Sequence, residues 1–514
     1  MSRRFKALRG EPRQSYDCVV IGAGIGGLLC ANLLARSGLQ VLVVERHYMA
    51  GGYCSTFKRK GFVFDAATHF YPLLGNRGTL TGKLLEDLGV NTVWIKMDPV
   101  DQFHFPDHTK FSVPADFELY TAQLQREFPE EVSGIDDFFS LVRKVYLLGL
   151  LQFFRGKPTE QLSRYLKLSV QDVLDTYFRS PKLKLLLTAD TGHWGSPPNR
   201  TSFVFDSMLR LAYFLGNYYP KGGSQVFADG LASRFEEMGG HILMSSLVTH
   251  IHVRNQRACG LEIETGIESH RKRINVHAGV VISNSDLLHT LENMIGSDLV
   301  DPDYLASVRK LRPTLPCFVT HIGLQGVPTK LLEEVQGYYW SSWDANDIAT
   351  NAFKIFVPTL FDREIAPPEK HIIIVQKITD IDYSTIVNWT EHKASVEHQI
   401  TANLERIVPD FSDHVVVKLS ASALTSHRYT LNHHGAMLGW ELAPDQLGVD
   451  RPDVIGPVEN LYFVGHWTQP GGGITPVMVS AMRVAQLITA PHDSHVTLPP
   501  IPDTLAATAT PIPV

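Results

Sequence analysis

Cysteine is scarce in this chain, and neither charge is in marked excess. Five cysteines occur among 514 residues, and no two of them form a CxxC pair. They indicate reduced, mostly buried thiols in a reducing compartment. Basic and acidic residues nearly balance, 47 against 53. The strong basic excess that is typical of nucleic-acid-binding proteins is therefore missing, and we expect no nucleic-acid partner.

Three common catalytic motifs are also missing, namely HExxH, GxSxG and the Walker phosphate loop. Their absence disfavours a zinc peptidase, an α/β-type serine hydrolase and a P-loop NTPase. We therefore expect neither a metal ion nor a nucleophilic triad at the site.

No secretory leader is visible, and the one long uncharged run does not require a membrane. The first 13 residues hold five basic side chains and no apolar core. We interpret them as a solvated terminus, with attraction to an anionic membrane surface as the alternative. Residues 18–35 carry no charge over the length of a bilayer span. Their glycines fit a strand, a turn and a helix better.

One pattern near the N-terminus is the most informative of the chain. An apolar run at 18–21 leads into a glycine turn at 22–27, and a helical pattern covers 28–37. A second apolar run, at 41–44, ends on Glu45. Strand, glycine turn, helix, strand and carboxylate follow in the order of a dinucleotide-binding βαβ unit.

Each part of this unit has a physical role. Gly22 permits the tight turn, Gly24 lets the backbone approach a pyrophosphate, and Gly27 lets the helix pack closely on the sheet. The helix N-terminus favours the phosphates. Glu45, 18 residues after Gly27, is placed to accept hydrogen bonds from ribose hydroxyls. Its charge would repel a 2′-phosphate, so NADP is not expected.

Similar patterns later in the chain predict a discontinuous domain. A helical pattern at 225–237 precedes short strand patterns that end near 282, and a strand at 461–465 precedes a glycine-rich turn. The predicted domains are an α/β cofactor domain (15–75, 221–299 and 446–490), an α+β substrate and membrane-contact domain (76–220 and 300–445), and flexible tails (1–14 and 491–514).

Two apolar runs of the second domain each allow two interpretations. The run at 145–154 is flanked by basic residues, and the run at 208–219 is rich in aromatics. Each could be a core helix or an amphipathic patch that dips into a bilayer.

Five further segments make the chain resemble a known superfamily. They are GGYCSTFKRKGFVFDAATHF (51–70), REFPEEVSGIDDFF (126–139), YPKGGSQVFADGLASRFEEMGG (219–240), HRYTLNHHGAMLGWELAPDQ (427–446) and ENLYFVGHWTQPGGGITPVMVSAMRVAQLI (459–488). Together with the βαβ unit, they resemble the amine-oxidase-like flavoproteins over about residues 15–490. Within that superfamily the chain is similar to phytoene desaturases, carotenoid cis–trans isomerases and retinol saturases.

The resemblance implies a Rossmann-like FAD-binding domain in a two-domain fold that is shared with amine oxidases and GDP-dissociation inhibitors. The FAD contacts that it implies are Gly22, Gly24, Gly27, Glu45, Arg46, Gly51, Gly52, Ser55, Thr56, Val248, Gly465, His466, Ile474 and Thr475. Val248 would bind the adenine through its backbone. The turn before Thr475 opens a helix and would stabilise negative charge on a reduced flavin. His466 departs from the pattern, since many relatives have aspartate there.

The implied activity is FAD-dependent redox chemistry on a long apolar polyene. Carotenoid desaturation or cis–trans isomerisation is favoured, and a retinol-saturase-like reduction is the alternative. With one nucleotide fingerprint, electrons would pass to or from a quinone or another diffusing partner. No catalytic residue is assigned; the weak candidates are His69, His427 and Arg428. We expect peripheral attachment to the cytoplasmic side of a membrane, because a carotenoid or retinoid substrate lives in the bilayer.

Two other functions remain open. An amine oxidase would need an aromatic cage at the flavin, for which Tyr429 and Trp440 are the candidates. An escort-type protein that binds lipid or prenyl groups has the same fold and holds no flavin. The intact glycine set with Glu45 argues against this second alternative.

Overall fold

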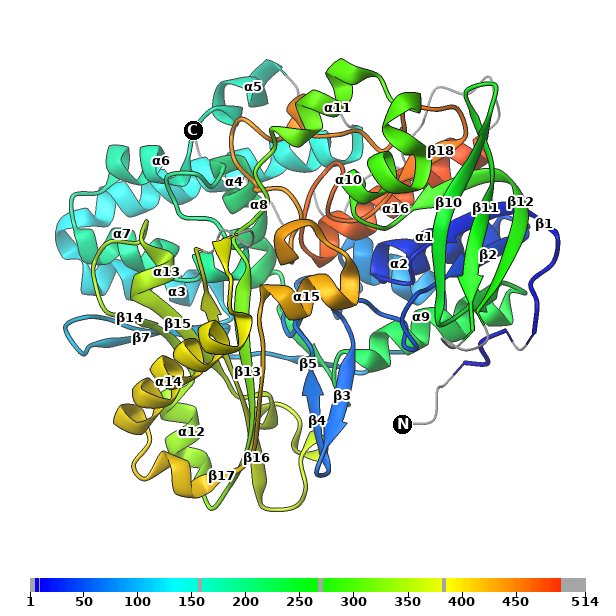
Figure 1. Ribbon diagram of the computed structural model, residues 1–514. Helices are drawn as coiled ribbons and strands as arrows, with labels where there is room; N and C mark the ends of the chain where they lie inside the picture. Colours follow the sequence, from blue (N-terminus) through cyan, green and yellow to red (C-terminus); the bar gives the residue numbers. More distant parts are fainter. Residues whose placement is uncertain (1–4, 9, 156–159, 267–270, 381–384, 491–514) are drawn as a thin grey trace.

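The computed structural model describes residues 5–8, 10–155, 160–266, 271–380 and 385–490. Two seven-stranded sheets form its framework, and Figure 1 shows them toward opposite ends of the molecule. Helices from several parts of the chain pack around both sheets. The predicted α/β fold class is confirmed.

The predicted βαβ unit is present with nearly the expected bounds. Strand β1 (Ser15–Ile21), helix α1 (Ile25–Arg36) and strand β2 (Val41–Val44) follow one another, and the two strands pair in parallel. Every residue of α1 except Arg36 is buried. The uncharged run at 18–35 is therefore a strand, a glycine turn and a core helix that is covered on all sides, as predicted.

The first sheet is assembled from distant parts of the chain. Its order is β10-β11-β12-β1-β2-β9, and β18 pairs with β12. The strands beyond the βαβ unit are β9 (His241–Leu243), β10 (Ser246–Arg254), β11 (Arg257–Thr265), β12 (Lys272–Ser283) and β18 (Leu461–Phe463). Helices α9 (Gln225–Glu237) and α16 (Ile474–Thr489) pack on α1. The helix and strand patterns predicted within 225–282 are present.

The second sheet has the order β17-β13-β16-β15-β14-β6-β7. Its strands are β6 (Asp101–His104), β7 (Lys110–Val113), β13 (Cys317–Gln325), β14 (Gly337–Trp340), β15 (Ala352–Phe356), β16 (Lys370–Ile378) and β17 (Val415–Ala421). Alternate residues of β16 belong to different cores: Ile373 packs in one cluster and Ile374 in another. Both faces of this sheet are therefore covered, as the period of two in a strand allows.

Helices α4 (Val132–Arg155) and α8 (Phe203–Phe214) pack together beside the second sheet (Figure 1). The other helices are α2 (Leu80–Asp87), α3 (Phe117–Glu127), α5 (Glu160–Leu166), α6 (Val170–Tyr177), α7 (Pro181–Thr188), α10 (Leu287–His289), α11 (Pro302–Arg309), α12 (Thr329–Val335), α13 (Ile348–Asn351), α14 (Trp389–Ile407) and α15 (Ala423–Thr430). Two small antiparallel sheets of two strands complete the fold: β3 (Thr56–Arg59) with β4 (Phe62–Asp65), and β5 (Trp94–Lys96) with β8 (Tyr218–Pro220).

The two ambiguous apolar runs differ in their surroundings. Within α4, Val145 is fully buried whereas Leu147 is 49% exposed, so this helix buries one face and shows the other to solvent. Side chains from residue 151 to the end of that run lie outside the description. The run at 208–219 is buried or half-buried throughout, which favours a core element.

The N-terminal segment is less free than expected. Phe5 is only 4% exposed and packs into the core around α1. The Leu8 N–H donates to the Ile242 carbonyl at 2.8 Å. The flexible tail predicted over 1–14 is therefore wrong for residues 5–8, because an aromatic anchor and a backbone hydrogen bond hold them. The tail predicted over 491–514 lies beyond the described residues.

Candidate functional site

A cavity of about 1760 Å³ runs from the first sheet to the second and is the candidate site. Its wall includes Gly22 and Glu45 at the carboxyl ends of β1 and β2, where α/β sheets bind ligands. It also includes Tyr213 of α8 and Val319 of β13. A pocket for one drug-sized ligand measures about 300–1,000 Å³. This cavity therefore has room for a dinucleotide and for a second, long molecule.

The three fingerprint glycines have distinct roles in the structure. Gly22 has a φ of +95°, which is a left-handed conformation that favours glycine. A Cβ on Gly27 would lie 2.1 Å from the Gly22 carbonyl oxygen, so α1 could not pack as closely. Gly22 and Gly24 line the cavity, whereas Gly27 is not among the lining residues. Gly27 therefore acts through helix packing, and the direct FAD contact that the resemblance implied for it stays a prediction.

Glu45 lies at the end of β2 with both carboxylate oxygens engaged. One accepts the Ala23 N–H at 2.7 Å and the other accepts the His47 N–H at 2.7 Å. Burial raises the pKa of Glu45, and these two bonds and the neighbouring Arg46 oppose that shift. Arg46 and Val248 line the same end of the cavity. The carboxylate is thus fixed in place with lone pairs left for ribose hydroxyls.

A second glycine loop lies against the first. The Gly51 N–H donates to the Ala23 carbonyl at 2.7 Å, and Gly24 and Gly51 form a parallel bridge. A Cβ on Gly52 would come within 3.4 Å of the Gly24 Cα. Gly51, Gly52, Ser55 and Thr56 all line the cavity. The two glycine loops therefore form a cradle, and side chains at the glycine positions would fill its space.

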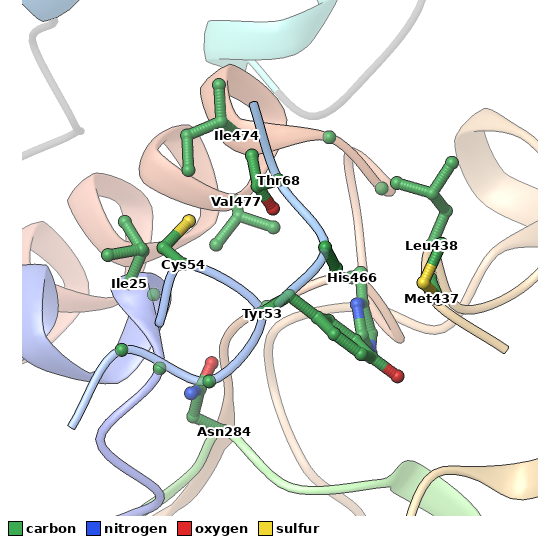
Figure 2. Close-up of a pocket in the computed structure, with 18 of the residues that line it drawn as sticks. Ile25, Tyr53, Cys54, Thr68, Asn284, Met437, Leu438, His466, Ile474 and Val477 are labelled. Atoms are coloured by element: carbon green, nitrogen blue, oxygen red, sulfur yellow. The ribbon is translucent and has the colours of Figure 1, made fainter. Parts of the chain in front are cut away.

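Two helices direct uncapped N-termini at this cavity. Helix α1 begins after Gly24 and α16 begins after Gly473, and neither has a side-chain cap. Both glycines line the cavity, and so do Ile474 and Thr475 in the first turn of α16. Figure 2 shows Ile474 on that helix, above Val477. Free N–H groups and the positive end of the helix dipole favour an anion.

These features fit the FAD that the sequence predicts. The glycine cradle with the N-terminus of α1 suits a pyrophosphate, and Glu45 suits the adenosine ribose. The N-terminus of α16 suits the edge of a flavin ring that gains negative charge. Each of the other predicted FAD contacts, including Gly465 and His466, also lines the cavity.

Asn284 is a cavity residue that the sequence did not reveal. It directly follows β12, and Figure 2 shows its side chain below Tyr53 and Cys54. A Cβ on Gly465 would be 2.7 Å from its Oδ1, and one on Gly24 would be 2.9 Å from its Nδ2. The signal was available, because polar residues after a parallel strand lie at the ligand-binding edge of a sheet.

His466 lies in the wall where many relatives have an acid. Burial and the nearby Arg451 guanidinium lower the pKa of His466 to about 3, so the imidazole is neutral at pH 7. Its ring is 6.1 Å from the Tyr53 ring, and Figure 2 shows the two rings together. A neutral imidazole can still offer a hydrogen bond to a ribityl or phosphate oxygen, without the charge of an aspartate.

The three catalytic candidates differ in position. His69 lies in the wall, stacks on Phe356 at 4.3 Å between ring centroids, and is 3% exposed. Burial and the charge of Lys354 lower the pKa of His69 to about 3. His427 and Arg428 are not among the lining residues, so the structure does not support a catalytic role for them.

Helical geometry explains this correction. Within α15 and its N-cap, the cavity-lining residues are Ser422, Thr425, Ser426, Tyr429 and Thr430, a spacing of three and four that marks one helix face. His427 and Arg428 lie off that face. The resemblance therefore identified a helix that borders the cavity, but it singled out His427 and Arg428 instead of the residues on the cavity-lining face.

The candidate aromatic cage for an amine is not formed. Trp440 is fully buried and does not line the cavity. Tyr429 is 55% exposed and packs edge-on against His47, beside Glu45 rather than beside Gly473. These two residues therefore do not enclose a common ligand.

A family model described as flavin-containing amine oxidoreductase matches residues 25–489. Prolycopene isomerase 1 of an Oncidium hybrid cultivar is 26% identical, over 93% of this chain and 85% of that protein. The all-trans-retinol 13,14-reductase of Danio rerio is also 26% identical, over 88% of this chain and 82% of its own.

Two solved structures show the same fold at low identity. Putrescine oxidase in its wild-type form bound to putrescine has a TM-score of 0.66 and 15% identity, covering 93% of this chain and 100% of that one. An oxidoreductase from Methanosarcina mazei has a TM-score of 0.62 and 18% identity, covering 91% and 99%. At this identity the likeness establishes the architecture alone.

Proposed function

Since this chain belongs to the family of flavin-containing amine oxidoreductases, we propose that its FAD-dependent chemistry acts on a long apolar polyene. The favoured reactions are cis–trans isomerisation of a carotenoid and saturation of a retinoid double bond. The names of two relatives, a prolycopene isomerase and a retinol reductase, support this substrate class.

The cavity beyond the glycine cradle is the observation that carries the proposal. Its far part is walled mainly by apolar side chains: Leu150, Phe205, Met208, Leu209, Ala212, Cys317 and Val319. Such a wall stabilises an apolar ligand by removing its surface from water, at about 25 cal/mol per Å².

The chain's own residues then have a defined task. Glu45, the glycine cradle and the start of α16 hold FAD, which when bound supplies a two-electron acceptor or donor. The apolar wall excludes water and aligns the polyene along the cavity. His69 and His466 are neutral, so neither adds a positive charge to the cavity wall.

The test is to express the chain in a host that accumulates carotenoids and, in parallel, to supply retinol to the purified, FAD-loaded protein with dithionite as the two-electron reductant. Polyenes are extracted and separated by chromatography. An isomerised or saturated product, absent with the flavin-free Gly24→Val variant, would support the proposal. Unchanged polyenes in both assays, with flavin bound, would contradict it.

We also propose that the protein attaches peripherally to the cytoplasmic side of a membrane. Tyr146 and Leu150 of α4 line the cavity, and Leu147 on the same helix is 49% exposed. An apolar substrate could therefore enter from a bilayer along this helix. In the part of the chain that the structure describes, no helix is both long and apolar enough to cross a membrane. The five unpaired cysteines support the reducing side.

Liposome flotation tests this attachment. The Leu147→Glu variant should float less than the wild type, whereas Val93→Glu, at a position that is 62% exposed in the loop before β5, should not differ. Equal flotation of both variants and the wild type would contradict a role for α4.

We further propose that a quinone or another diffusing partner exchanges electrons with the flavin, since the chain has one nucleotide fingerprint.

A further inference from the structure

A chain of polar groups lies buried beside the apolar part of the cavity. Its members are Asp101, Lys354, His193 and Tyr213, which we term the Lys354 cluster. Lys354 is 1% exposed, and its Nζ lies 2.7 Å from Asp101 Oδ2. Lys354 Nζ also lies 2.8 Å from His193 Nε2. On the other side of the ring, His193 Nδ1 lies 3.1 Å from the Tyr213 hydroxyl oxygen.

The protonation states along this chain follow from the contacts. Burial lowers the pKa of Lys354, but the contact with Asp101 opposes that shift, and two aromatic rings face Nζ, Phe70 at 4.0 Å and Tyr338 at 4.5 Å. We therefore assign Lys354 as the ammonium of an ion pair with Asp101. An ammonium only donates, so His193 Nε2 must accept. Burial and the Lys354 charge keep the pKa of His193 well below its usual value, so the ring is neutral.

The direction of the last bond is then fixed. A neutral imidazole that accepts at Nε2 carries its proton on Nδ1 and donates it to the Tyr213 oxygen. The Tyr213 hydroxyl therefore has its own proton left to donate. Within the described residues, His193 is the one hydrogen-bond partner of this hydroxyl. Asp101 and Lys354 lie behind the wall, whereas His193 and Tyr213 are part of it.

We propose that the Tyr213 hydroxyl donates a hydrogen bond to an oxygen atom at the end of the substrate. This inference rests on the proposed function and narrows it: the polyene is oxygenated, an alcohol, ether or carbonyl compound, rather than a pure hydrocarbon. A buried donor that lacks an acceptor beside an apolar cavity is costly unless a ligand satisfies it, and it discriminates against a ligand that lacks the acceptor. His193 and Lys354 are positioning residues that fix the direction of this donor.

Binding to the FAD-loaded protein tests the inference with three matched ligands: retinol, its methyl ether, and the hydrocarbon in which hydrogen replaces the hydroxyl. The ether oxygen only accepts hydrogen bonds. We expect the wild type to bind the alcohol and the ether about five- to tenfold more tightly than the hydrocarbon. The Tyr213→Phe variant should lose this preference for both oxygenated ligands.

Tyr338→Phe is the matched control, because it removes a hydroxyl beside the same cluster but outside the cavity wall. It should keep the wild-type preference. All ligands are measured on one preparation, so a loss of folded protein lowers every signal and leaves the ratio unchanged. An unchanged ratio in Tyr213→Phe, or a change for the alcohol but not the ether, would overturn the donor assignment. Failure of every polyene to bind the wild type would instead overturn the proposed function.

Discussion

Replacing Gly27 by alanine is the sharpest test of the nucleotide site. The added Cβ would lie 2.1 Å from the Gly22 carbonyl oxygen, and this neighbour is backbone that cannot rotate away. To relieve this clash, either helix α1 must move away from the sheet or the backbone at Gly22 must leave its left-handed turn conformation. Overpacking of this kind costs about 1–3 kcal/mol, against about 1 kcal/mol gained from alanine in a helix. We expect a lower melting temperature and a greater than tenfold loss of FAD affinity, equivalent to about 1.4 kcal/mol.

The assay combines the flavin absorbance of the purified protein, titration with added FAD and a thermal melt. Gly230→Ala in α9 is the matched control, since its Cβ would meet a valine methyl at 3.3 Å. That variant should keep its flavin and melt no lower than the wild type, since alanine is favoured over glycine within a helix. A Gly27→Ala protein with stoichiometric FAD and an unchanged melt would refute the assignment of α1 as the pyrophosphate helix.

Three further predictions concern charged groups. Glu45→Ala should lower FAD affinity at least tenfold, because it removes the ribose acceptor and orphans the Ala23 and His47 N–H groups; calorimetric titration with FAD measures this, and wild-type affinity would contradict it. Burial raises the pKa of Asp190 from 3.8 to about 7, so the folded state binds more protons and stability falls as the pH rises from about 4 to about 7. Asp190→Asn should flatten this slope in melts recorded across that range, and an unaltered slope would exclude Asp190 as its source. Arg451 is 1% exposed and donates to backbone carbonyls of Trp440, Glu441, Gln446, His466 and Thr468. Arg451→Lys should destabilise the protein, since each buried carbonyl left without a donor costs about 1–3 kcal/mol, whereas Arg254→Lys on the surface should melt like the wild type.

The βαβ unit could be predicted because its determinants are local. The glycine turn, two apolar runs and Glu45 lie within about 30 residues, and each specifies its own geometry. The FAD-facing loops at Gly51 and Gly473 followed from the resemblance and lie in the cavity wall as expected.

The far half of the cavity could not be predicted in the same way. Lys354 and His193 are 161 residues apart in sequence, and no local pattern links them. Their contact depends on how β15 packs beside the loop before α8. Whether His427 or its neighbours face the cavity depends on the rotation of α15 about its axis. The eight residues of this helix show no clear apolar face from which that rotation could be predicted.

The pairing of β12 has a consequence for how the chain acquires its cofactor during synthesis. One edge of β12 pairs with β1, about 260 residues earlier, and the other pairs in part with β18, about 180 residues later. Contacts between residues so far apart in sequence form slowly. During synthesis β1 is made first and cannot complete its sheet until β12 has been made. Helix α16, which packs on α1, emerges last. We therefore expect flavin to be captured only after release of the full chain, so that a ribosome-stalled or truncated product ending before residue 460 stays colourless and depends on chaperones.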